Sequence, residues 1–303
     1  MQDIQLNVGT FTRSVLIHLA RNDGSLSRAG IDVRETSVTS SPAQFKSLDA
    51  GEFDLIFTSP DNVLAYRFLS RNPLGRNLPV RIESAIDRGL GLSLCTAPSI
   101  GSPEDLRGKT VGVDVPGSGF AFVAYALLER EGLHPGDYAV EALGSTPRRA
   151  SALVEGGCAA TVLNAGNELR AQGAGCTIVS SAVDLGPYLG TVLASLDTPQ
   201  AKNEDSKRRF TDVMLATADE VVMGMREAQV VEAAMLLLGL TETEARAHYE
   251  CLLAPATGLI ADGKVDRASI ATLVNLRRTY MPAFELDSIE GALSQVVADR
   301  ALT

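Results

Sequence analysis

The sequence predicts an α/β protein with two βα lobes, a ligand cleft between them and a helical C-terminal region. Three observations lead to this prediction. Short apolar strands alternate with helical segments over residues 1–92 and again over residues 102–186, a pattern typical of parallel sheets. Strand-like segments near residues 82–97 and 188–197 connect the two sets. From Ser206 onward the pattern is almost purely helical.

The two connecting segments determine the expected domain organisation. A chain that crosses twice between two lobes inserts its second lobe into its first. We therefore expect lobe one to comprise residues 1–92 and 197–303, including the C-terminal helices, and lobe two to comprise residues 93–196. A chain of 303 residues is long enough to give both lobes a sizeable core.

Lobe one is expected to alternate strands with helices. We place its strands at residues 4–8, 31–38 and 53–57, and its helices at residues 13–21, 41–48 and 63–69. Ser41 and Pro42 support the start of the second helix, because a hydroxyl caps exposed N–H groups and proline suits the first turn. The segments 81–86 and 91–95 are expected to form two longer strands around a turn at residues 87–89.

Lobe two repeats this alternation, and the helical region follows it. The expected strands are residues 111–113, 138–143, 158–163, 177–179 and 188–195, with helices at 120–131, 147–155 and 166–172. The C-terminal helices are expected at residues 207–225, 227–238, 242–251, 267–279 and 288–298. An apolar run within residues 227–238 favours core packing over a dimer face.

The segment 102–120 contains a capped turn, a buried strand and a small-residue loop that opens an apolar helix near Phe120. Gly117, Ser118 and Gly119 leave the backbone N–H groups of that helix start uncovered, which is typical of an anion-binding site. A well-capped βα turn without a ligand is the alternative. A nucleotide-binding fingerprint is less favoured, because the third glycine is missing and no phosphate-loop lysine follows.

Similar polar loops follow the other predicted strands. In parallel sheets, ligands bind at the carboxyl ends of strands, where helices begin. The candidate ligand-binding residues in these loops are Thr10, Phe11, Thr12, Ser59, Asp61, Asn62, Gly117, Ser118, Gly119, Asn164 and Asn167. Arg148 and Arg149 start a helix of lobe two, and at most one of them is expected to face the cleft.

Three segments resemble the type II periplasmic binding proteins. Residues 102–113, Ser-Pro-Glu-Asp-Leu-Arg-Gly-Lys-Thr-Val-Gly-Val, resemble the motif that opens lobe two of that family. Residues 43–57 and 150–156 resemble a second family segment and its copy, although residues 157–160 lack the usual aspartate. The resemblance covers roughly residues 1–220 and is strongest to the branch of sulfonate, taurine and nitrate binders and NMT1/THI5-like proteins.

The resemblance implies a solute-binding protein that captures a small organic acid or a polar heteroaromatic ligand between its lobes for an ABC importer. It implies the loops named above as ligand contacts, with Tyr188 near the second crossing, and a transporter permease as a possible partner. The alternative is an enzyme on the same fold, such as a decarboxylase, desulfinase or hydrolase. The nucleophilic cysteine of the desulfinases corresponds to Phe11 and Thr12 here, and we assign no catalytic residue, although Cys95 remains a candidate to face the cleft.

Composition restricts the other possibilities. The chain has 27 basic and 37 acidic residues, a net charge of −10, which disfavours a nucleic-acid partner. The four cysteines and three histidines show no metal-binding spacing, so neither a metal nor another cofactor is expected. Three of the cysteines, Cys95, Cys158 and Cys176, lie in apolar surroundings typical of buried residues.

The sequence leaves the compartment open. It contains no apolar run of the roughly 18 residues that a transmembrane helix needs. Its first residues show neither the basic nor the apolar region of a signal peptide. The expected location is periplasmic or extracellular if a signal peptide has been removed, and otherwise cytoplasmic.

Overall fold

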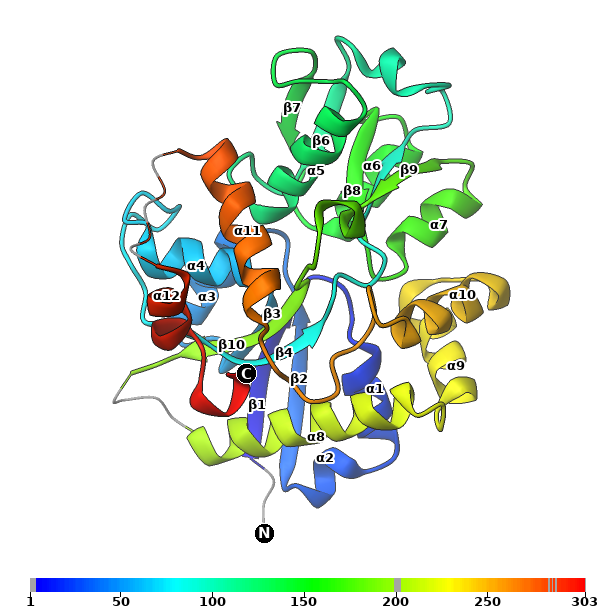
Figure 1. The fold of residues 1–303 in the computed structure, drawn as a ribbon. Coiled ribbons are helices and arrows are strands. Elements are labelled where there is room, and N and C mark those ends of the chain that lie inside the picture. The colour runs from blue at the N-terminus through cyan, green and yellow to red at the C-terminus, as the bar shows by residue number, and fades with distance from the viewer. Residues whose placement is uncertain (1–3, 199–202, 283, 285, 287, 303) are drawn as a thin grey trace.

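The computed structural model describes residues 4–198, 203–282, 284, 286 and 288–302. Within this part of the chain, the strands form two five-stranded sheets with the orders β2-β1-β3-β10-β4 and β7-β6-β8-β5-β9. The first sheet lies in the lower half of Figure 1 and the second in the upper half. The predicted α/β fold class with two sheet-centred units is confirmed.

Both sheets are mixed rather than parallel. The first contains β1 (Ile4–Thr10), β2 (Ile31–Ser37), β3 (Leu55–Thr58), β4 (Val80–Asp87) and β10 (Thr191–Leu196). The second contains β5 (Ser93–Thr96), β6 (Thr110–Val113), β7 (Ala139–Ala142), β8 (Ala160–Leu163) and β9 (Thr177–Ser181). β10 runs antiparallel to β3 and β4, and β5 runs antiparallel to β8 and β9. The chain reaches each of these two strands from the other sheet, at the edge where the parallel strands of its own sheet end. Each strand therefore runs opposite to those parallel strands.

The pairing of β10 corrects the predicted boundary of lobe two. β10 was expected in lobe two, because that lobe was predicted to span residues 93–196, but β10 belongs to the first sheet. The second crossing therefore precedes Thr191. The strands β4 and β5, expected around one turn, do not pair with each other but belong to different sheets.

Helices cover both sheets. Their bounds are α1 (Val15–Asn22), α2 (Ser25–Arg28), α3 (Ser41–Asp49), α4 (Pro60–Phe68), α5 (Gly119–Arg130), α6 (Thr146–Val154), α7 (Asn167–Gly173), α8 (Glu204–Val222), α9 (Glu227–Leu238), α10 (Glu242–Leu253), α11 (Arg267–Tyr280) and α12 (Ile289–Val296). The 3₁₀ turns are η1 (Pro103–Leu106), η2 (Ala182–Leu185) and η3 (Asp299–Ala301). α8 crosses the first sheet beside α1, and α3 and α4 lie toward the other side (Figure 1).

The C-terminal helices contact both sheet units, although they were expected on lobe one alone. α11 packs against α4 of the first unit and α5 of the second, and α10 packs against α7 of the second. α9 buries Val230, Ala233 and Ala234 in the core, as predicted, while Leu236 on its outer face is 69% exposed. The tail therefore connects the two units from two sides.

Two apolar clusters hold the fold together. One packs the first sheet against α1, α8, α9 and α10, with Phe57, Phe210 and Met214 among its members. The other is continuous from the opposite face of the first sheet through α4 and α11 to the second sheet. Because this second cluster spans both sheets, the two units share a core rather than having one each.

Candidate ligand-binding site

A cavity of about 140 Å³ lies where strands of both sheets end. The first sheet contributes Thr10 at the end of β1, Thr58 at the end of β3 and Asp87 at the end of β4. The second sheet contributes Asp114 after β6 and Asn164 after β8. The cavity thus occupies the position at which sheets of this kind bind ligands.

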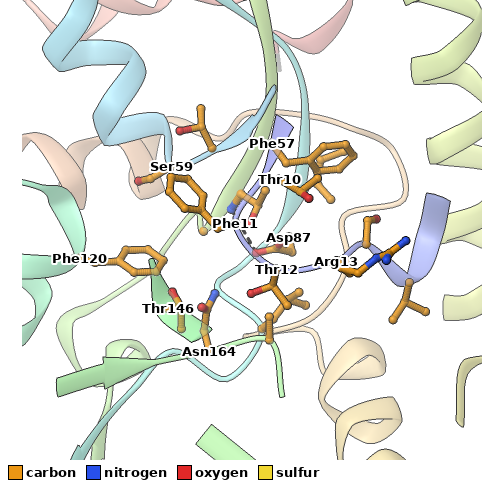
Figure 2. A pocket seen from close by; sticks show the side chains of 18 of the residues that line it. Thr10, Phe11, Thr12, Arg13, Phe57, Ser59, Asp87, Phe120, Thr146 and Asn164 are labelled. Carbon is orange, nitrogen blue, oxygen red and sulfur yellow. Dashed lines mark hydrogen bonds between the residues drawn. The ribbon is translucent and has the colours of Figure 1, made fainter. Parts of the chain in front are cut away.

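Most of the residues predicted from the sequence line this cavity. These are Thr10, Phe11, Thr12, Ser59, Asn62, Ser118, Gly119 and Asn164. They come from four separate loops, and Figure 2 shows that Thr10, Phe11, Ser59 and Asn164 are gathered around one space. Their role as ligand contacts remains a prediction.

Helix starts from both sheet units face the cavity. Ser59 caps α4 by accepting a hydrogen bond from the N–H of Asp61, at 3.3 Å, and Ser118 caps α5 by accepting one from Ala121, also at 3.3 Å. Thr146, the first residue of α6, also lines the cavity. Because the start of a helix carries partial positive charge, this side of the cavity favours a negatively charged ligand group.

Arg149 brings a full positive charge to the same side. The structure buries Arg149 in the cavity wall and leaves Arg148 exposed, in agreement with the expectation that at most one faces the cleft. Its guanidinium donates hydrogen bonds to the carbonyl groups of Gly144 and Val162 at 2.6 and 3.1 Å. Burial lowers the pKa of Arg149 to about 10, and the charge of Asp114 acts in the opposite direction. Arg149 therefore stays charged at neutral pH.

Two carboxylates in the cavity wall already have partners in the chain. Asp114 accepts a 2.5 Å hydrogen bond from the hydroxyl of Ser41, which joins the second sheet unit to α3 of the first. Asp87 accepts hydrogen bonds from the backbone N–H groups of Gly89 and Thr191 at 2.8 and 3.1 Å. Burial raises the pKa of Asp87 to about 6.

Asp61 and Gly117 do not line the cavity, because the C-terminal tail binds both. Arg277 of α11 donates two hydrogen bonds to the carboxylate of Asp61, at 2.7 and 2.5 Å, and a third to the carbonyl of Gly117 at 3.2 Å. Both side chains of the ion pair are 1% exposed. Sequence reasoning missed this contact because residues 61 and 277 lie 216 positions apart.

Asn167 and Tyr188 are also absent from the cavity wall. The Asn167 side chain donates to the carbonyl of Asn164 at 2.9 Å and to the hydroxyl of Thr12 at 3.3 Å. It therefore positions two lining residues instead of facing the space itself. Tyr188 is 2% exposed and packs beside Gly89 at the crossing between the sheets.

One wall of the cavity was not predicted. It consists of Leu238 at the end of α9, His248 and Leu252 of α10, Leu259, and Leu90 from the first crossing. Their sequence patterns were those of ordinary core residues and gave no signal of a site. Phe120, near which the apolar helix was predicted to begin, lines the cavity as well (Figure 2).

The structure does not favour Cys95 as a nucleophile. Cys95 is fully buried and is not among the residues that line the cavity. Burial raises its pKa well above the usual range of a thiol, so the reactive thiolate is disfavoured. Cys158 and Cys176 are buried, as predicted.

Among the described residues, His, Cys, Asp and Glu side chains form no group of three or more that could hold a metal ion. No helix in the same part of the chain has the length and apolarity to cross a membrane.

The architecture is that of the periplasmic binding proteins, with a cavity between two α/β units. A sequence profile described as NMT1/THI5 like matches residues 12–228, and the chain belongs to this family. The predicted family membership is therefore confirmed. A comparison with curated protein sequences finds no match.

Solved structures with this fold include two binding proteins. The alkanesulfonate-binding protein SsuA from Xanthomonas axonopodis pv. citri, bound to MOPS, is 13% identical with a TM-score of 0.73; the match covers 100% of this chain and 99% of SsuA. The periplasmic nitrate-binding protein NrtA from Synechocystis PCC 6803 is 10% identical with a TM-score of 0.76, covering 98% and 86%.

A third similar structure is DSZB in complex with biphenyl-2-sulfinic acid. It is 14% identical with a TM-score of 0.64, and the match covers 99% of this chain and 98% of DSZB. At these levels of identity the similarity establishes the fold.

Proposed function

We propose that this protein is a solute-binding protein that holds a small organic acid reversibly in the cavity between its two sheet units. The observation that supports this most directly is the convergence of helix starts from both units on one space, at Ser59, Ser118 and Thr146. Oriented N–H groups of this kind bind anions without a metal. The buried charge of Arg149 adds to the same preference.

The comparisons support an anionic ligand. SsuA is described as binding alkanesulfonates and NrtA as binding nitrate, so two proteins of this fold recognise small anions. A polar heteroaromatic ligand is the second class we expect, because Phe11 and Phe120 line the cavity and offer ring faces. We propose that the protein delivers its ligand to the permease of an ABC importer, and that it works in the periplasm.

A thermal-shift screen of sulfonates, carboxylates and pyrimidines tests the proposed function. The chain has no tryptophan, so indole fluorescence cannot report binding and the melting temperature is the suitable signal. A ligand at a hundredfold excess over its Kd stabilises the folded state by about 2.7 kcal/mol. We expect acids to raise the melting temperature. A screen without any shift would contradict the proposal.

Mass spectrometry of each hit after overnight incubation separates binding from catalysis. This control is necessary because the sequence left open an enzyme on the same fold, and DSZB, which shares the fold, is described in complex with a sulfinic acid. We expect the ligand to remain unchanged. Loss of a carboxylate, sulfinate or amide group would instead indicate an enzyme, and the variant Cys95→Ser would then show whether that thiol takes part.

A further inference from the structure

The cavity has a second, apolar end formed by the C-terminal helices. We call the apolar end the part lined by Ile86, Leu90, Leu238, His248, Leu252 and Leu259. In Figure 1 the helix α10 lies to the right of the strand ends, α4 lies to the left, and α5 lies above them in the upper unit. In Figure 2, Ser59 before α4 and Phe120 of α5 lie on the left side of the space. The helix starts of α4 and α5 therefore lie on another side of the cavity than α10.

His248 is the polar group of the apolar end. It is 2% exposed, its Nδ1 atom is buried without a hydrogen-bond partner, and no hydrogen bond joins its ring to another described residue. Burial lowers its pKa to about 4, so the ring is neutral at physiological pH. A neutral imidazole has one donor and one acceptor, and burying its Nδ1 without a partner costs free energy. A polar group of a bound ligand can supply a partner to this ring.

The size of the cavity limits the ligand. Its volume is about 140 Å³. A cavity of roughly 150 Å³ lined by aliphatic and aromatic side chains is known to hold benzene. The cavity is therefore of the size that holds a single six-membered ring or a hydrocarbon body of similar volume.

We propose that the apolar end selects acids whose charged group is attached to a single ring or short hydrocarbon body, and that His248 recognises a hydroxyl or carbonyl group at the far end of that body. This inference rests on the proposed function and names its ligand class. Leu238, His248, Leu252 and Leu259 lie outside residues 12–228, the part that matches the family profile.

Two matched series of acids test the inference by calorimetric titration. They are methanesulfonate, benzenesulfonate and 4-hydroxybenzenesulfonate, and acetate, benzoate and 4-hydroxybenzoate. In the series whose acid group binds, we expect the ring to raise affinity at least tenfold through apolar burial. We expect the hydroxyl to raise it about tenfold more through its hydrogen bond to His248.

Variants connect these gains to the residues. His248→Leu is expected to abolish the gain from the hydroxyl, with the affinity for the short acid unchanged within twofold. Leu238→Ala is expected to weaken binding of the ring acids about tenfold and to leave the short acid unaffected. Leu236→Ala is the matched control, because Leu236 lies on the same helix, is 69% exposed and does not line the cavity.

The outcomes separate this inference from the proposed function. If no acid of either series binds, the proposed function is wrong and the inference fails with it. If the short acids bind but the ring acids bind no more tightly, or if His248→Leu retains the preference for the hydroxyl, only the inference is overturned. Should His248→Leu not fold, His248→Phe and Leu238→Ala give the same comparison.

Discussion

Two buried carboxyl groups, one near each end of the cavity, differ in the partners that the fold gives them. Asp61, beside the start of α5, is paired through two hydrogen bonds with Arg277. Glu168 of α7, close to Gly91 and Cys251 beneath the apolar end, is 3% exposed, and its Oε2 atom has no hydrogen-bond partner among the described residues. The first carboxylate contributes to holding the two sheet units together, whereas burial of the second disfavours its ionised form and raises its pKa to about 8.

Breaking the paired carboxylate should have the largest effect. Arg277→Met leaves Asp61 charged and buried without its partner, and such a change costs between about 3 and 5 kcal/mol of folding free energy. Chemical denaturation measures this loss. Arg278→Met is the matched control, because Arg278 is the next residue of α11 and is exposed. A loss below about 1 kcal/mol for Arg277→Met would show that the ion pair does not stabilise the fold.

Replacing the buried carboxyl group of Glu168 should act in the opposite direction and depend on pH. Burial raises the pKa of Glu168 from 4.5 to about 8, so the folded state holds this proton more tightly than the unfolded state does. The resulting stability is complete below pH 4.5 and is lost as pH rises toward 8. Glu168→Gln should therefore be more stable than the parent protein by up to about 3 kcal/mol at pH 7, but not at pH 4.5.

Denaturation at several pH values tests the prediction for Glu168. The exposed residue Glu155 provides the control variant Glu155→Gln, for which we expect the same difference from the parent at every pH. If the stability difference caused by Glu168→Gln is also independent of pH, the pKa of Glu168 is not raised in the folded protein.

The smallest expected effects are on the affinity for ligands, and they allow the two ends of the cavity to be compared directly. We call the polar end the part of the cavity lined by Ser59, Asn62, Ser118 and Thr146 at the helix starts. The Asn62 side chain there donates to the hydroxyl of Thr58 at 3.2 Å. Asn62→Ala should weaken short and ring acids alike, by about tenfold, because both place their charged group there. Leu238→Ala should weaken the ring acids alone. Equal losses of short and ring acids in both variants would show that the two ends have no separate roles.

The polar end was predictable because its geometry is local. Ser59 with Pro60, and Ser118 with Gly119, are sequence signals of a helix start, and the alternation of strands and helices places such starts at one edge of each sheet. Residues 59 and 62 were therefore predicted together with the loop that holds them. The signal does not say which neighbour faces the space, and so Asp61 was predicted as well.

The apolar end was not predictable because it depends on how the tail packs. Leu238 and Leu252 have the spacing of core residues on amphipathic helices, and His248 had no neighbouring group in the sequence. Only the packing of α9 and α10 against α7 and the first sheet unit brings these side chains to the cavity. Arg277 was missed for the same reason.

In the proposed complex, the cavity holds an acid at the helix starts with its apolar body toward His248. A crystal structure with the tightest-binding para-hydroxylated acid of the two series tests this most directly. We predict the acidic group within hydrogen-bond distance of the backbone at Ser118 or Ser59, and the hydroxyl within hydrogen-bond distance of the His248 ring. A ligand bound in the reverse orientation, or outside the cavity, would rule out this binding mode.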